Sequence, residues 1–296
     1  QANTRESFDM TNKIASKIAF LFPGQGSQAV GMGKDLYLNS IAAREVFDEI
    51  DDRLGRKLST LMFEGPDDEL RRTENTQPAI MATSVAAWRA MEEATGILQV
   101  PNATAGHSLG EYSALIAANS LGIEDGLKLV RKRGLLMEEA PSGSMAAILG
   151  LDFLSIEEIC EQVSIDQSMQ VQCANLNSPS QTVISGSIEA VAKAQELCLE
   201  AGAKRAITLK VSIASHSPLM ESVQEEFHAF LSTIELKIPK VSVLHNVNSS
   251  VSAMPDEIKN LLVQQLYSPV QWVNICKEIS ALCLPAIECG PGKVLG

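Results

Sequence analysis

A serine between two glycines is the strongest chemical signal in this sequence. Residues 106–110 read GHSLG, which matches the pattern G-x-S-x-G, and the residues just before them have the character of a short strand. The glycines allow a sharp turn into a helix, which lifts the hydroxyl of Ser108 away from the backbone. Free N–H groups at the start of that helix, including that of Leu109, can stabilise a developing oxyanion. The pattern predicts a nucleophilic serine rather than a turn with an incidental one.

A serine hydroxyl becomes a strong nucleophile only when a base takes its proton, and the chain has four histidines. His107 adjoins the serine, but its side chain should diverge across the sharp turn. His228 falls in the middle of a helical pattern, and His245 ends a strand. His216 lies in a polar loop, where catalytic residues concentrate. We expect His216 to be the base, with His245 as the second candidate.

A glycine-rich loop at 24–31 (GQGSQAVG) follows the first expected strand. Its spacing fits neither the dinucleotide fingerprint, whose third glycine position is Ala29, nor a phosphate-binding loop, because Asp35 follows Gly33-Lys34 where serine or threonine is needed. We therefore expect a loop whose backbone N–H groups approach a ligand closely.

Three consecutive basic residues, Arg131, Lys132 and Arg133, fall in a helical pattern. A solvated basic face is the usual outcome for such a run. The alternative is that one arginine turns inward and binds a carboxylate, because guanidinium forms two parallel hydrogen bonds to that planar group. Spacing alone does not choose which arginine would do so.

These residues need a scaffold, and the chain predicts one in which strands alternate with helices. Such alternation is typical of a mainly parallel α/β sheet. Expected strands cover 17–22, 103–106, 241–247 and 285–289, and expected helices cover 40–54, 78–95, the stretch from the serine motif to about 119, 123–140, 218–234, 255–266 and 271–283.

A second pattern interrupts the first between residues 142 and 211. It runs strand 144–150, helix 155–164, strands 169–175 and 181–186, helix 188–201 and strand 204–211, which is the β-α-β-β-α-β order of a ferredoxin-like module. We predict a small domain at 142–211 inserted into a large domain formed by 17–141 and 212–296, with 1–16 as a disordered extension.

Composition narrows the function classes. The chain has 296 residues and a net charge of −12, which argues against a general nucleic-acid or membrane-surface binder because both need a basic face. Its apolar runs are far shorter than the roughly 20 residues that span a bilayer, and no secretion signal is evident. Six scattered cysteines without a C-x-x-C pair favour free thiols in a cytoplasmic protein over disulfides or a metal site.

Taken together, these motifs resemble the malonyl-CoA:acyl carrier protein transacylase family, which is related to the acyltransferase domains of polyketide synthases. The resemblance covers about 17–296, nearly the whole chain. The motifs that carry it are FPGQGSQ at 22–28, TQPA at 76–79, GHSLGEY at 106–112, KRG at 132–134, NLNSPSQTVISG at 175–186, ASHSPLM at 214–220, QLYSPVQW at 265–272 and ECGPGKVL at 288–295.

The resemblance implies a fold and a mechanism. The fold would be an α/β-hydrolase-like large domain with an inserted ferredoxin-like domain. The reaction would be a ping-pong transfer of a malonyl group from malonyl-CoA to acyl carrier protein, with no cofactor or metal beyond the coenzyme A thioester that serves as substrate. The implied roles are Ser108 as nucleophile, His216 as base, backbone N–H groups of Gln25 and Leu109 as oxyanion hole, Arg133 as carboxylate holder and the carbonyl of Gln265 as the group that orients the histidine, with His107, Asn175, Ser215 and Asn246 as further candidates to line the site.

Three alternatives remain open at this stage. Ser215, a small residue before the histidine, resembles polyketide acyltransferases that accept methylmalonyl, whereas Leu109 resembles the malonyl pattern. An acyl-thioester hydrolase on the same scaffold is the second alternative, although it would not need an arginine for a free carboxylate. The third is a non-catalytic module that docks a carrier protein. We favour malonyl transfer.

Overall fold

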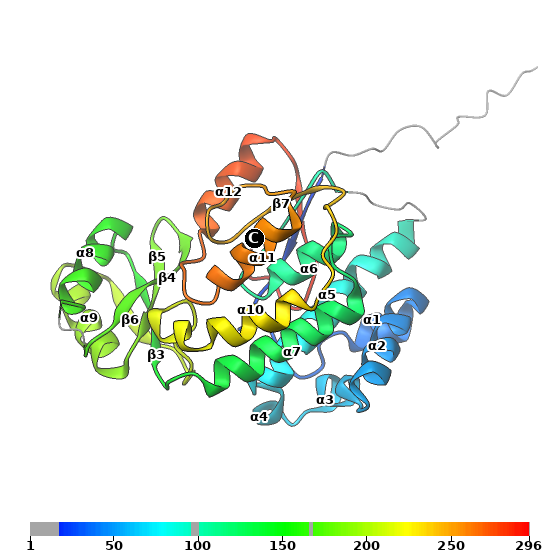
Figure 1. Cartoon of the computed structure of the whole chain (residues 1–296), viewed down its shortest axis with the longest axis horizontal. Helices are drawn as coiled ribbons and strands as arrows, with labels where there is room; N and C mark the ends of the chain where they lie inside the picture. Colours follow the sequence, from blue (N-terminus) through cyan, green and yellow to red (C-terminus); the bar gives the residue numbers. More distant parts are fainter. Residues whose placement is uncertain (1–17, 96–100, 166–167, 296) are drawn as a thin grey trace, which may run out of the picture.

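Two separate β-sheets organise the chain (Figure 1), which is described here by a computed structural model. The structure describes residues 18–95, 101–165 and 168–295. The extension predicted at 1–16 lies outside these residues. One sheet is parallel and the other antiparallel, and this confirms the α/β fold class with two differently built parts.

The parallel sheet has the strand order β7-β2-β1-β8. Its strands are β1 (Ala19–Phe22), β2 (Ala103–Gly106), β7 (Ser242–Leu244) and β8 (Ala286–Glu288). Every residue of β1 and β2 is buried, as expected for parallel strands covered on both faces. All four strands match predicted ones: β2 has the predicted bounds, and the other three are shorter than predicted.

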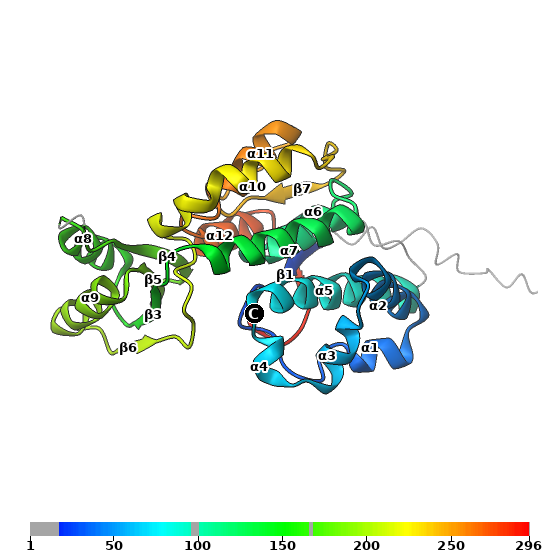
Figure 2. The same cartoon turned by 60° about the horizontal axis from the view of Figure 1, so that its bottom comes forward.

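Alternate residues of β1 point to the two helical layers, because successive side chains of a strand face opposite sides of a sheet. Phe20 and Phe22 belong to the larger core, which includes residues of α5 (Thr73–Thr95). Ala19 and Leu21 belong to a smaller core with α12 (Trp272–Ala281). Figure 2 shows β1 between these layers.

The remaining helices of the large part surround this sheet. None of the described helices is long and apolar enough to cross a membrane. These remaining helices are α1 (Lys34–Asn39), α2 (Ile41–Leu54), α3 (Leu58–Glu64), α4 (Asp67–Leu70), α6 (Gly110–Ala117), α7 (Ile123–Glu139), α10 (Gln224–Ser232) and α11 (Pro255–Gln264).

Three features of these helices differ from the prediction. The short helices α1, α3 and α4 were not expected, because four to seven residues give too little apolar periodicity to detect. Helix α5 begins at Thr73 rather than 78, since its polar first turn is held by side-chain bonds such as Thr76 Oγ1 to the carbonyl of Leu70 at 2.6 Å. The helix predicted at 218–234 is a 3₁₀ helix at Pro218–Val223 followed by α10.

The antiparallel sheet has the order β4-β5-β3-β6, which is the ferredoxin-like arrangement of a β-α-β-β-α-β chain. Buried apolar residues of α8 and α9 pack against those of the sheet. Figure 1 shows this unit at one end of the molecule. The domain boundaries at 142 and 211 stay a prediction. Its elements are β3 (Ser144–Leu149), α8 (Phe153–Val163), β4 (Val171–Ser178), β5 (Gln181–Gly186), α9 (Ile188–Glu200) and β6 (Arg205–Thr208).

Strand β4 also bonds to the large part of the chain. The N–H of Leu176 donates to the carbonyl of Val270 at 3.0 Å, and the N–H of Val270 donates to the carbonyl of Ala174 at 2.8 Å. These bonds place the intervening Asn175 beside Val270, in the segment between α11 and α12.

Close backbone packing at the end of β1 leads to a first prediction. A Cβ on Gly110 would lie 2.0 Å from the carbonyl oxygen of Phe22, whereas a Cβ on Gly122 would meet nothing within 4 Å. Backbone cannot yield as a side chain does, so Gly110→Ala should lower the free energy of unfolding by about 3 kcal/mol or more. The control Gly122→Ala should change it by less than about 1 kcal/mol. Urea denaturation followed by circular dichroism compares them, and equal midpoints would contradict the packing argument.

Candidate active site

Ser108 occupies a tight turn between β2 and α6. Its φ angle of 50° is left-handed, a conformation that L-residues other than glycine seldom adopt. A Cβ on Gly106 would lie 1.9 Å from the backbone of Gly110, and a Cβ on Gly110 would lie 2.0 Å from the carbonyl oxygen of Phe22, so the turn packs this way only because both positions lack side chains. This is the strand–turn–helix geometry that G-x-S-x-G motifs require, and it presents the serine hydroxyl outside the backbone.

The hydroxyl of Ser108 meets the imidazole of His216. Ser108 Oγ lies 2.7 Å from His216 Nε2, and His216 Nδ1 lies 2.7 Å from the carbonyl oxygen of Gln265. A carbonyl oxygen only accepts hydrogen bonds, so Nδ1 carries the ring proton and Nε2 is left to accept the proton of the serine. The structure thus brings together the expected nucleophile, its expected base and the expected orienting carbonyl.

The loop that carries His216 is held on both sides. Its φ angle is 59°, again left-handed. Its N–H donates to the carbonyl of Leu266 at 2.9 Å, and its own carbonyl accepts a hydrogen bond from Gln172 Nε2 at 2.7 Å. Gln172 also donates to the carbonyl of Tyr267 at 2.7 Å, so a β4 side chain ties the histidine loop to the segment after α11.

His216 is neutral at ordinary pH. Burial is the larger cause and the positive charge of Arg133 the next, and together they lower its pKa from 6.5 to about 3 against the opposing effect of the hydrogen bond to Gln265. Because only the neutral imidazole can accept a proton, the shift leaves His216 able to accept one over a wide pH range.

Of the three consecutive basic residues in α7, Arg133 turns inward. Arg131 is exposed, Lys132 pairs with Glu226, and Arg133 is 1% exposed. Arg133 Nη2 donates to Ser108 Oγ at 3.1 Å and to the side-chain oxygen of Gln265 at 3.0 Å. Its Nε finds no hydrogen-bond partner within the described ranges, and Arg133 lines the same cavity as Ser108, which places a cation beside the serine.

Two backbone N–H groups near the serine, those of Gln25 and Leu109, were predicted to form an oxyanion hole. Gly24 lies against the turn, since a Cβ there would be 2.3 Å from the carbonyl oxygen of His107, and this brings the loop that contains Gln25 close to Ser108. In the part of the chain that the structure describes, neither Gln25 N–H nor Leu109 N–H has an acceptor. The N–H of Ser108 itself is occupied by Asn246 Oδ1 at 2.7 Å.

A cavity of about 660 Å³ opens over these groups. It lies between the two parts of the chain, because β3 contributes Met145 and β4 contributes Asn175. The His107 ring bonds to Asn177 at 2.8 Å rather than to the serine. The lining includes Gln25, His107, Ser108, Arg133, Asn175, Ser215 and His216, which are seven of the ten predicted site residues.

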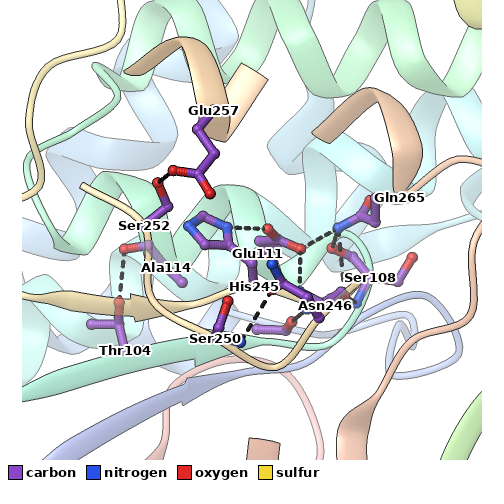
Figure 3. A network of polar contacts seen from close by, with 12 residues as sticks. Thr104, Ser108, Glu111, Ala114, His245, Asn246, Ser250, Ser252, Glu257 and Gln265 are labelled. Atoms are coloured by element: carbon purple, nitrogen blue, oxygen red, sulfur yellow. Dashed lines mark hydrogen bonds and ion pairs between the residues drawn. The ribbon is translucent and has the colours of Figure 1, made fainter. Parts of the chain in front are cut away.

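His245, the second candidate for the base, is occupied elsewhere. Its Nδ1 bonds to Glu111 Oε1 at 2.7 Å, as Figure 3 shows. Sequence reasoning missed Glu111, which is 1% exposed. One indication of it is present in the sequence: Glu111 is an acidic residue three positions after Ser108. It lies in the first turn of α6, in which every residue is buried.

The described residues contain no cluster of His, Cys, Asp or Glu suited to a metal ion. All six cysteines are free.

Comparisons with known proteins extend this picture. A family model described as "Acyl transferase domain" matches residues 19–288. The malonyl CoA-acyl carrier protein transacylase of Bacillus subtilis is 49% identical over 284 residues, covering 95% of this chain and 88% of that protein.

Solved structures show the same likeness. A malonyl-transacylase in complex with a type II polyketide acyl-carrier protein matches with a TM-score of 0.90 and 41% identity, covering 95% of this chain and 91% of that one. An acyl carrier protein S-malonyltransferase from Vibrio cholerae matches with a TM-score of 0.90 and 44% identity, covering 95% and 92%. This chain is an acyltransferase, and it belongs to the malonyl-CoA:acyl carrier protein transacylase family.

Proposed function

We propose that this enzyme transfers a malonyl group from malonyl-CoA to the phosphopantetheine thiol of an acyl carrier protein through an acyl-enzyme on Ser108. One observation carries the proposal: Ser108 Oγ lies within hydrogen-bond distance of both a neutral base, His216, and a buried cation, Arg133. A hydrolase of simple esters needs the base, but it has no use for a buried cation beside the nucleophile.

In the first half of the reaction, His216 Nε2 takes the proton of Ser108 as the serine oxygen attacks the thioester carbonyl carbon. The N–H groups of Gln25 and Leu109 hold the oxyanion. The carbon–sulfur bond then breaks, and coenzyme A leaves as a thiol with the proton from His216. The malonyl group remains as an ester of Ser108.

In the second half, the carrier-protein thiol occupies the place that coenzyme A vacated. His216 takes the thiol proton, the sulfur attacks the ester carbonyl, and the carbon–oxygen bond to Ser108 breaks. The proton on His216 returns to the serine oxygen. The site must favour the thiol over water, and the partly enclosed cavity over Ser108 supports this selection.

The acyl donor, malonyl-CoA, carries negatively charged phosphates, and the protein carries a net charge of −12. Electrostatic attraction between the two must therefore come from basic residues close to the site. Lys128 and Lys132 are paired with acidic residues. Lys210 lines the cavity and has no salt bridge within the described residues. It is the cation we assign to the phosphates or to the acidic carrier protein, and at a Debye length of about 8 Å it acts without opposition from distant acidic surface.

The acyl-enzyme provides the first test of this function. Incubation with malonyl-CoA should add a malonyl mass to the wild-type protein, and Ser108→Ala should abolish the addition, because it removes the hydroxyl that lies 2.7 Å from His216 Nε2. Intact-mass spectrometry measures both. Labelling that persists in the variant, or its absence in the wild type, would contradict the assignment. Immediate release of free malonate would instead identify a hydrolase.

The role of Arg133 is tested with two donors. Arg133→Ala should slow malonyl transfer roughly 10- to 100-fold, because it removes a charge-assisted pair of about 1.5–3 kcal/mol, and should slow acetyl transfer much less. Arg133→Lys keeps the charge but not the two-pronged geometry and should fall between. Competition among malonyl-, methylmalonyl- and acetyl-CoA, read from the mass on Ser108, measures the preference. An equal loss for malonyl and acetyl would show another role.

The lowered pKa of His216 predicts an unusual pH profile. The second-order rate constant for acylation should stay level from pH 8 to about pH 5, whereas a histidine of ordinary pKa would halve it near pH 6.5. The unfolded chain protonates His216 near 6.5 and the folded chain only near 3, so stability should fall as the pH drops through this window. Stopped-flow acylation, with circular dichroism as the control for folding, checks the profile. A midpoint near pH 6.5 would contradict it.

A further inference from the structure

Gln265 forms hydrogen bonds to other residues of the site through its side chain and its backbone carbonyl. Its Nε2 donates to the carbonyl of Ser108 at 3.0 Å and to Glu111 Oε2 at 2.6 Å. Its side-chain oxygen accepts from Arg133 Nη2, and its backbone carbonyl accepts from His216 Nδ1. Gln265 is completely buried, so no water competes for these contacts.

The amide of Gln265 has two possible orientations, and its neighbours allow one. Arg133 only donates hydrogen bonds, so it requires the amide oxygen on its side. The Glu111 carboxylate only accepts, so it requires the NH₂ group on the other side. The cation and the anion therefore fix the amide from opposite ends, and this in turn holds Arg133 Nη2 beside Ser108.

Glu111 reaches the nucleophile by a second route as well. Its Oε2 accepts from the N–H of Asn246 at 3.2 Å, and its Oε1 accepts from His245 Nδ1. Asn246 then accepts from the N–H of Ser108 and donates to the carbonyl of Gly106 at 2.7 Å. Figure 3 shows this network behind the serine, with Glu111 at its centre.

Within the described residues Glu111 forms no salt bridge with lysine or arginine. Its two oxygens serve three donors, from Gln265, His245 and Asn246. Burying a carboxylate costs free energy unless the group is fully hydrogen-bonded. The hydrogen bonds of Glu111 go to the residues that hold Ser108 and Arg133.

We propose that Glu111 is a positioning residue for acyl transfer, which fixes the amide of Gln265 so that Arg133 is held for the acyl carboxylate. The inference rests on the proposed function, since it assumes that Arg133 binds that carboxylate. Glu111 touches neither Ser108 Oγ nor His216, so its effect on Arg133 and on the acyl preference passes through Gln265, whereas Asn246 links it to the backbone of Ser108.

The test is Glu111→Gln, which keeps the shape but replaces one acceptor oxygen by a donor NH₂. The variant loses the negative charge of Glu111, and where its NH₂ group faces Gln265 Nε2 the amide of Gln265 must flip and turn its own NH₂ toward Arg133. We expect malonyl acylation of Ser108 to slow about 10- to 100-fold, as is usual when a positioning partner is lost, and the malonyl-to-acetyl preference to fall about 10-fold. Stopped-flow acylation with both donors gives the rates.

A matched control separates positioning from stability. Asp51 is also a buried carboxylate, and it accepts from the N–H and hydroxyl of Ser59 at 2.9 and 2.6 Å in a different part of the chain. Asp51→Asn should lower the midpoint of thermal unfolding and leave the acyl preference unchanged. Glu111→Asp is the second variant, in case Glu111→Gln does not fold. Its shorter side chain cannot serve all three donors, so the preference should fall again.

A double-mutant cycle with Gln265→Ala completes the test. If Glu111 acts through Gln265, adding Glu111→Gln to Gln265→Ala should cost little more preference. Additive effects, an equal loss for both donors, or a Glu111→Gln enzyme with wild-type rates and preference would overturn the inference. A wild-type protein that malonyl-CoA never acylates would overturn the proposed function instead, so the two failures are distinguishable.

Discussion

The hydrogen bond from His216 Nδ1 to the carbonyl of Gln265 is the constraint on which the site depends. It assigns the ring proton to Nδ1 and leaves Nε2 facing Ser108. A carbonyl orients the ring without supplying the negative charge of an aspartate, so burial and Arg133 keep the imidazole neutral. Within the proposed mechanism, a substrate carboxylate at Arg133 offsets that positive charge and so favours proton transfer to His216.

Close approach of backbones brings the other parts of the site to this hydrogen bond. Gly24 packs on the carbonyl of His107, and Gly110 packs on that of Phe22. These contacts set the loop after β1 and the turn after β2 side by side, at the carboxyl ends of adjacent parallel strands. Ligand sites in open α/β sheets occur at such ends. The inserted sheet closes the cavity from the other side through Asn175 and Met145.

Local patterns predicted much of this molecule, and their failures are informative. The buried strands were recognisable as short apolar runs that end in turn residues, and the long helices because their apolar residues recur at helical spacing. The short helices α1, α3 and α4 carry too few residues for such a pattern. His216 could be preferred from its loop context alone, whereas the choice of Arg133 over Arg131 needed the resemblance to a family, because both lie on one helical run.

What the sequence could predict, and what only the tertiary structure decided, depends on how far apart in the chain the interacting residues lie. The turn at Ser108 is local, since the glycines two residues away on each side permit it, so residues 106–110 were enough to predict a nucleophilic serine. The partners of that serine are distant in the chain: Arg133 is 25 residues away, His216 is 108 and Gln265 is 157. Glu111 is close in sequence, yet its contacts with His245 and Asn246 span 134 and 135 residues. Hydrogen bonds across such separations exist only once the sheet and helices have packed. The tertiary structure therefore decided which residues are hydrogen-bonded to one another in the site.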